Sequence, residues 1–113
     1  MKNRETLYRI VIRKIKYNSD GLKIEGFLVF KKGSREKLPC IIYNRGGNGD
    51  FGMITNRQIN NILVPLANAG YVVVASQYRG TTGSEGREQY GGKDVNDVLN
   101  LISVLRKLTF ADT

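Results

Sequence analysis

The chain has 113 residues, of which 41% are hydrophobic and 25% charged, with a formal net charge of +8, which argues for one folded domain and against a disordered chain. It contains no histidine and one cysteine, Cys40, so a Ser-His-Asp or Cys-His nucleophile, an internal disulfide and a usual zinc site are all excluded within it. We therefore expect no bound metal and no cofactor.

The N-terminal part predicts an antiparallel β-hairpin over residues 8–31. Apolar and polar residues alternate through 8–17 and again through 22–31, with the turn-forming run Asn18-Ser19-Asp20-Gly21 between them. Residues 1–45 hold twelve Lys and Arg against four Asp and Glu, which accounts for the whole net charge. We expect this charge to line the solvated face of the hairpin. The alternative is a basic protein that binds nucleic acid or acidic surfaces.

The remaining elements alternate between strand and helix and form a β-α-β-α unit over residues 39–108. Residues 40–43 and 71–76 are apolar without alternation, as in the interior of a parallel sheet, and amphipathic helical patterns follow each of them. A strand, a helix and a strand in succession pair the two strands in parallel through a right-handed crossover. The order β-β-β-α-β-α therefore predicts an α/β fold.

Helix boundaries can be read from capping residues and from proline. Thr55 or Asn56 is placed to cap the first helix, whose interior Pro65 should kink or delay it, and Gly70 ends it. The second helix is predicted over residues 95–108, with acidic residues in its first turns and basic residues near its end.

Nine of the 13 glycines lie in two loops that follow the buried strands, at residues 44–52 and 78–92. Both loops leave the carboxyl ends of parallel strands, where open α/β sheets hold their ligands. The pattern Gly47-x-Gly49-x-x-Gly52 matches a dinucleotide fingerprint, and Arg79 favours a 2′-phosphate, so an NADP-type binding module stays open as an alternative. The same loop can instead offer backbone N–H groups to an oxyanion.

Four segments in a fixed order carry a resemblance to a known family. They are Asn44-Arg45-Gly46-Gly47, residues 66–75, residues 77–86 and residues 91–98. Together they resemble the first half of the catalytic domain of prolyl-oligopeptidase-like serine peptidases, within the α/β-hydrolase superfamily. The resemblance implies a single incomplete domain over residues 1–113, a partial α/β-hydrolase fold with an N-terminal hairpin, a parallel pair of third and fourth strands, and later strands missing.

The resemblance also assigns a role to the first glycine-rich loop. The family commonly has His-Gly-Gly after the third strand, with a backbone amide in the oxyanion hole, and this maps to Arg45-Gly46-Gly47. Gly46 and Gly47 are thus the candidate oxyanion-hole donors. Arg45 stands where the family has histidine, and a backbone donor tolerates this change.

The second loop is expected to support the first. Tyr78-Arg79-Gly80 resembles a structural turn of the family, and we expect Arg79 to pair with Asp94 or Asp97 and to pin the loop to the following helix. The alternative is that these two acids only interact with the helix dipole.

The catalytic triad is missing from this chain. The family carries its nucleophile in a Gly-x-Ser-x-Gly elbow after the next strand, and that strand would begin at residues 110–113. We therefore read the chain as an N-terminal fragment of a serine hydrolase that is inactive alone, with a peptide or ester as substrate only in a complete enzyme.

The expected partners follow from the same fragment. The third strand, residues 39–44, would be an exposed apolar edge, which favours self-association. The longest apolar run, residues 71–75, is far too short for a membrane span, and no signal-peptide core follows the basic start. We expect a cytoplasmic protein with neither a membrane nor a nucleic acid as partner.

Overall fold

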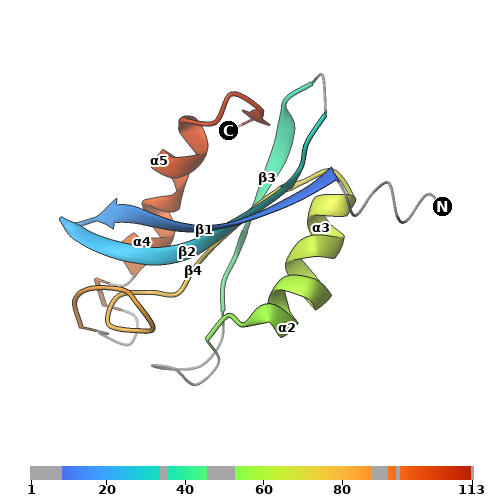
Figure 1. The fold of residues 1–113 in the computed structure, drawn as a ribbon. Coiled ribbons are helices and arrows are strands. Elements are labelled where there is room, and N and C mark those ends of the chain that lie inside the picture. Colours follow the sequence, from blue (N-terminus) through green and yellow to red (C-terminus); the bar gives the residue numbers. More distant parts are fainter. Residues whose placement is uncertain (1–8, 34–35, 46–52, 88–91, 94, 113) are drawn as a thin grey trace.

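The computed structural model describes residues 9–33, 36–45, 53–87, 92–93 and 95–112, which form one mixed sheet with helices on both faces (Figure 1). In chain order the elements are β1 (Ile10–Ser19), β2 (Leu22–Lys31), β3 (Leu38–Tyr43), α2 (Asn56–Gln58), the π-helical segment η1 (Ile59–Leu63), α3 (Val64–Asn68), β4 (Val72–Ser76), α4 (Val95–Leu99), α5 (Leu101–Arg106) and β5 (Ala111–Asp112). The strand order in the sheet is β1-β2-β4-β3-β5.

The strands β1 and β2 form the predicted antiparallel hairpin. Its turn has two residues, Asp20 and Gly21, with φ of 52° and 80°. Positive φ at both positions defines a type I′ turn, whose twist matches that of the paired strands. The predicted end of the first strand at Tyr17 is two residues short, because Ser19 still pairs with Leu22.

The strand β4 lies at the centre of the sheet, antiparallel to β2 and parallel to β3. The parallel pairing runs from Cys40↔Val72 to Tyr43↔Ala75. On the far side of β3, the short β5 pairs in parallel at Leu38↔Ala111. This arrangement confirms the predicted α/β fold with its N-terminal hairpin and parallel pair, and it places a fifth strand where the resemblance puts the start of one.

The first helical stretch begins at Thr55, which forms a capping box with Gln58. A π-helical turn directly precedes α3, where Pro65 occupies the first turn. Proline cannot donate a backbone hydrogen bond, and a π turn is one of the known ways in which a helix accommodates such a disruption. The expected disturbance at Pro65 therefore takes the form of a wider turn.

The second helical stretch differs from the predicted helix over residues 95–108. It is divided at Asn100 into α4 and α5, and it ends at Arg106. The amides of Lys107 and Leu108 donate to carbonyls three residues back, which tightens the last turn and ends the α-helix. In the part of the chain that the structure describes, no helix has the length and apolar character needed to cross a bilayer.

The core consists of two clusters, one on each face of the sheet. α4 and α5 cover one face, and α2, η1 and α3 cover the other (Figure 1). Alternate residues of β4 serve the two clusters, Val72 and Val74 in the first and Val73 and Ala75 in the second. Because both faces are covered, β4 is buried throughout, which explains its continuous apolar run.

Candidate functional site

The candidate residues gather beyond the carboxyl ends of the parallel strands β3 and β4. Arg45 follows β3, and residues 77–81 follow β4. Gly46 and Gly47, the predicted oxyanion donors, lie outside the described residues, as do Asp94 and the pattern Gly47-x-Gly49-x-x-Gly52. The site is therefore built here from the residues on either side of the first loop.

Arg45 holds the start of the first loop against the segment after β4. Its side chain is buried, and its Nη1 donates to the carbonyl of Gln77 at 2.8 Å and to Thr81 Oγ1 at 3.3 Å. The guanidinium also lies 5.4 Å from the ring centroid of Tyr78, whose hydroxyl donates to the Arg45 carbonyl at 3.4 Å. A planar cation with several donors can make all these contacts at once.

Gln77 holds the other end of the same loop. Its side-chain Nε2 donates to the carbonyl of Ile54 at 2.7 Å, and the Ile54 amide donates back to Gln77 Oε1 at 2.8 Å. Gln77 is 1% exposed, so neither bond competes with bulk water. The residues that follow β4 thus anchor both Arg45 and Ile54, and we call this set the Arg45–Gln77 clamp.

Sequence reasoning missed the role of Gln77. The only signal in the sequence is a long amide side chain directly after a buried apolar strand, where an uncharged polar group needs internal partners.

Arg79 and Asp97 form a buried ion pair. Arg79 Nη2 lies 2.9 Å from Asp97 Oδ1, Nε lies 3.2 Å from Oδ2, and the Arg79 amide donates to Oδ2 at 2.7 Å. The carboxylate of Asp97 is fully buried. Of the two acids expected to pair with Arg79, Asp97 makes the contact, and Asp94 lies outside the described residues.

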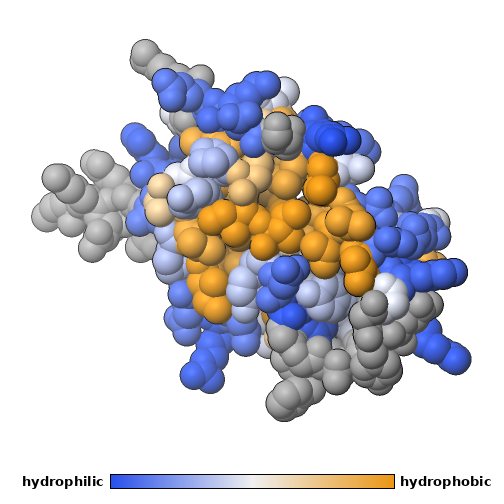
Figure 2. Space-filling view, turned by 180° about the vertical axis from the view of Figure 1, so that it is seen from behind, coloured by the Kyte–Doolittle hydropathy of each residue, from blue (hydrophilic) through white to orange (hydrophobic). Residues whose placement is uncertain are grey.

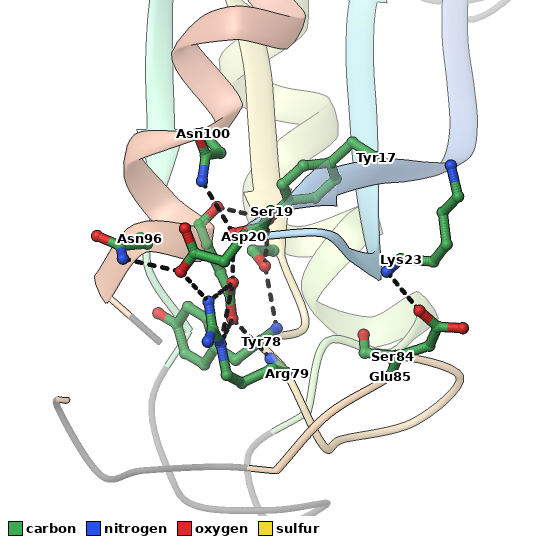
Figure 3. Close-up of polar contacts among 12 residues, drawn as sticks. Tyr17, Ser19, Asp20, Lys23, Tyr78, Arg79, Ser84, Glu85, Asn96 and Asn100 are labelled. Atoms are coloured by element: carbon green, nitrogen blue, oxygen red, sulfur yellow. Dashed lines mark hydrogen bonds and ion pairs between the residues drawn. The ribbon is translucent and has the colours of Figure 1, made fainter. Parts of the chain in front are cut away.

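The tip of the β1–β2 hairpin joins this ion pair (Figure 3). The hydroxyl of Ser19 donates to Asp97 Oδ1 at 2.6 Å, and Asp20 Oδ2 accepts from Arg79 Nη2 at 2.8 Å. The hydroxyl of Tyr17 donates to the Asp97 carbonyl at 2.5 Å. The hairpin, the turn after β4 and the start of α4 are therefore fastened to one another by a single polar network.

The turn after β4 has an unusual backbone. Tyr78 has φ of +71°, a left-handed conformation that is uncommon for a bulky residue. Its amide donates to Ser76 Oγ at 3.0 Å, and its hydroxyl reaches Arg45. The strain is held in place by contacts on both sides, as is common where a loop must be kept in one shape.

On both sides of this turn, the chain runs beside β2 in place of a strand. The amide of Gln77 donates to the Glu25 carbonyl at 2.8 Å, and the Glu85 amide donates to the Lys23 carbonyl at 2.8 Å. The Ser84 hydroxyl accepts from the Glu25 amide at 2.8 Å. These bonds satisfy the part of β2 that β4 no longer covers and fix the second loop.

The electrostatics of the network favour the charged forms of Arg79 and Asp20 and the neutral form of Tyr17. Hydrogen bonding to Asp97 raises the pKa of Arg79, and the Arg79 guanidinium lowers the pKa of Asp20. Burial raises the pKa of the Tyr17 hydroxyl. None of these shifts gives a group that exchanges protons near neutral pH. The network therefore suits positioning and not acid-base chemistry.

The ion pair also bears on the dinucleotide alternative. Two carboxylates engage the guanidinium of Arg79, which is 3% exposed, so it does not face solvent as a partner for a 2′-phosphate. Among the described residues, no three His, Cys, Asp or Glu side chains come together as a metal site.

Comparison with known proteins relates this chain to peptidases and other hydrolases. No protein-family model matches the chain. The uncharacterized peptidase YtmA of Bacillus subtilis (strain 168) is 32% identical over 91 residues, which are 80% of this chain and 34% of that protein. This chain thus spans about a third of the length of that relative.

Solved structures of a peptidase and an esterase also resemble this chain. The acylaminoacyl peptidase of Pyrococcus horikoshii matches with a TM-score of 0.72 and 26% identity over 98% of this chain and 19% of that chain. The acetyl xylan esterase from Paenibacillus sp. R4 matches with a TM-score of 0.70 and 21% identity over 94% of this chain and 39% of that chain, which bears on the fold alone. The chain is therefore part of a peptidase-like α/β-hydrolase domain.

Proposed function

We propose that this chain is the oxyanion-loop part of a serine hydrolase of the prolyl-oligopeptidase type and that it has no activity alone. The backbone N–H groups of Gly46 and Gly47 donate to the oxygen of a peptide or ester carbonyl while that carbonyl is attacked. The nucleophile, the acid and the histidine lie outside this chain. The proposed location of the enzyme is the cytoplasm.

The Arg45–Gln77 clamp carries this proposal. Oxyanion donors are effective when they are held in place before the reaction, because no free energy is then spent on reorienting them. Arg45 directly precedes Gly46, and Ile54 lies just beyond the same loop. Both are tied to Gln77 by bonds of 2.7 to 2.8 Å. A loop whose two ends are fixed to one buried residue is suited to this task.

The clamp also gives Arg45 a use that suits its departure from the family's histidine. The Arg45 guanidinium points to the segment after β4 and bonds Gln77 and Thr81. It therefore acts on the loop through its position, and the oxyanion donors remain backbone amides.

The test uses a chimera in which residues 9–112 replace the matching segment of the Pyrococcus acylaminoacyl peptidase. We expect the chimera to hydrolyse a chromogenic ester and the chain alone to give background rates. In the chimera, Gly47→Pro removes one N–H donor and should lower kcat by about 10²- to 10³-fold with little change in KM. Gly47→Ala keeps the N–H and is the matched control.

Two results contradict the proposal. One is turnover by the chain alone that withstands serine-directed inhibitor controls. The other is an equal kcat for the proline and alanine variants of a folded chimera, because a backbone donor at this position is then not used.

A further inference from the structure

We propose that a groove between the β1–β2 hairpin and α5 binds an extended acidic peptide. The groove has a volume of about 610 Å³ and is walled by β1, β2, α5 and the residues next to that helix. This volume lies within the usual range of ligand sites, about 300 to 1,000 Å³. None of its lining residues belongs to the Arg45–Gln77 clamp, so the proposal is independent of the hydrolase function.

The described lining residues of the groove include four cations, Arg13, Lys16, Lys23 and Lys107, and no acidic residue. Among the described residues, none forms an ion pair with these four side chains. Arg13 lies on the hairpin wall and Lys107 follows the helix on the other wall. Like charges on two walls repel each other, and a bound anion relieves that repulsion.

The register of the hairpin separates these cations. Lys16 pairs with Glu25 and Lys23 pairs with Asn18, so their side chains share the face of the hairpin turned away from α5, whereas Arg13 pairs with Leu28 on the α5 side. Arg13 and Lys107 are therefore the cations on the two facing walls of the groove.

The rest of the lining suits a peptide backbone. Between the cations the groove is apolar, with Ile15, Leu28 and Val104 among its residues. Ile15 and Lys16 point to opposite faces of β1, yet both line the groove, so it includes the outer edge of that strand. β1 is an end strand of the sheet. An extended peptide can add to such an edge through main-chain hydrogen bonds while its side chains enter the groove.

Nucleic acid fits this groove less well. Single-stranded nucleic acid is bound by exposed aromatic rings on which bases stack. Tyr17 is the one aromatic residue among the described lining residues, and it is 6% exposed and bonded through its hydroxyl to the Asp97 carbonyl.

The test measures binding of a fluorescein-labelled six-residue peptide of alternating glutamate and leucine to the full chain by fluorescence anisotropy. We expect binding that weakens with salt, and no binding of the matching lysine-leucine peptide. Arg13→Glu and Lys107→Glu should each weaken binding about tenfold or more, because each places a negative charge beside the carboxylates. Arg57→Glu, an exposed reversal of the same size on α2 at the other face of the sheet, should change binding less than twofold.

Lys107→Gln is included so that a weakened fold cannot be mistaken for lost binding. It should weaken binding of the peptide by a smaller factor than Lys107→Glu. The proposal is overturned if the peptide does not bind, or if Arg57→Glu weakens binding as much as Lys107→Glu. It is also overturned if decanoate or a single-stranded oligonucleotide displaces the peptide and shows the same dependence on Arg13 and Lys107.

Discussion

Asp97 is fully buried and lies in an ion pair with Arg79. Its two carboxylate oxygens accept bonds from the Arg79 amide, the Arg79 guanidinium and the Ser19 hydroxyl, so the cost of removing the charge from water is offset by close partners. Asp97 also lies in the first turn of α4, where the helix dipole favours a negative charge. Pairing with Arg79 and interaction with the dipole are therefore compatible roles for this residue.

We expect Asp97→Asn to lower the free energy of unfolding by about 3 to 5 kcal/mol, because it leaves the buried Arg79 guanidinium without its main partner. The measurement is urea-induced unfolding followed by circular dichroism. The matched control is Asp20→Asn, which removes the charge of a much more exposed partner of the same guanidinium and should have a far smaller effect. Equal losses for the two variants contradict the assigned role.

The hairpin uses two glycines for different reasons. Gly21 has φ of +80° and open space around it, so it is required for the backbone conformation of the turn. Gly26 in β2 is required for space, because a Cβ there would lie 2.3 Å from the Ala75 carbonyl oxygen on β4. The strands β2 and β4 therefore approach each other closely at this point.

Substitution by alanine should separate these two needs. Gly21→Ala is expected to cost about 1 to 2 kcal/mol from the positive φ alone. Gly26→Ala should cost about 1 to 3 kcal/mol through overpacking, and it should also speed hydrogen exchange in β4, because the strands must move apart. Thermal unfolding and amide exchange measure the two effects. Unchanged exchange in β4 for folded Gly26→Ala shows that the strands do not need this contact.

The molecule as a whole presents an apolar face beside a strand edge. Figure 2 shows apolar surface concentrated on the side turned away from the viewer in Figure 1. Among the described residues, β5 covers β3 only at Leu38 and Pro39, and β3 is half-buried from Cys40 to Tyr43. Edges of this kind pair with other chains unless they are charged or covered. We propose that two copies of the chain associate through β3.

Sedimentation velocity should show a dimer that strengthens with added salt, because the net charge of +8 on each copy is then screened. Ile41→Lys puts a charge on this edge and should shift the chain to monomer. Ile12→Lys makes the same change at an exposed position of the opposite end strand, β1, and should leave the dimer intact. A reductant is present throughout, although burial raises the pKa of the Cys40 thiol and slows disulfide exchange. Monomeric wild-type protein, or equal effects of the two variants, contradicts this proposal.

Local chemistry made much of the fold predictable from the residues. The apolar run of β4 reports directly that both of its faces are covered, and Thr55 caps a helix through groups only three residues apart. The alternation in β2 was less informative, because Leu28, Val29 and Phe30 are buried in succession and serve both core clusters. The parallel pairing of β3 and β4 also followed, because a helix between two strands leaves few other topologies.

The contacts that shape the candidate site could not be predicted in this way. Tyr17 and Asp97 are 80 residues apart in the chain, and Arg45 and Gln77 are 32 apart. Hydrogen bonds have short range and strict geometry, so these pairs are decided by how the sheet and helices pack and not by any local pattern. The types of these residues indicated that each would need a hydrogen-bond partner once buried. Only the tertiary structure decided which residues became the partners, because a buried polar group is stable only where a partner lies within about 3 Å.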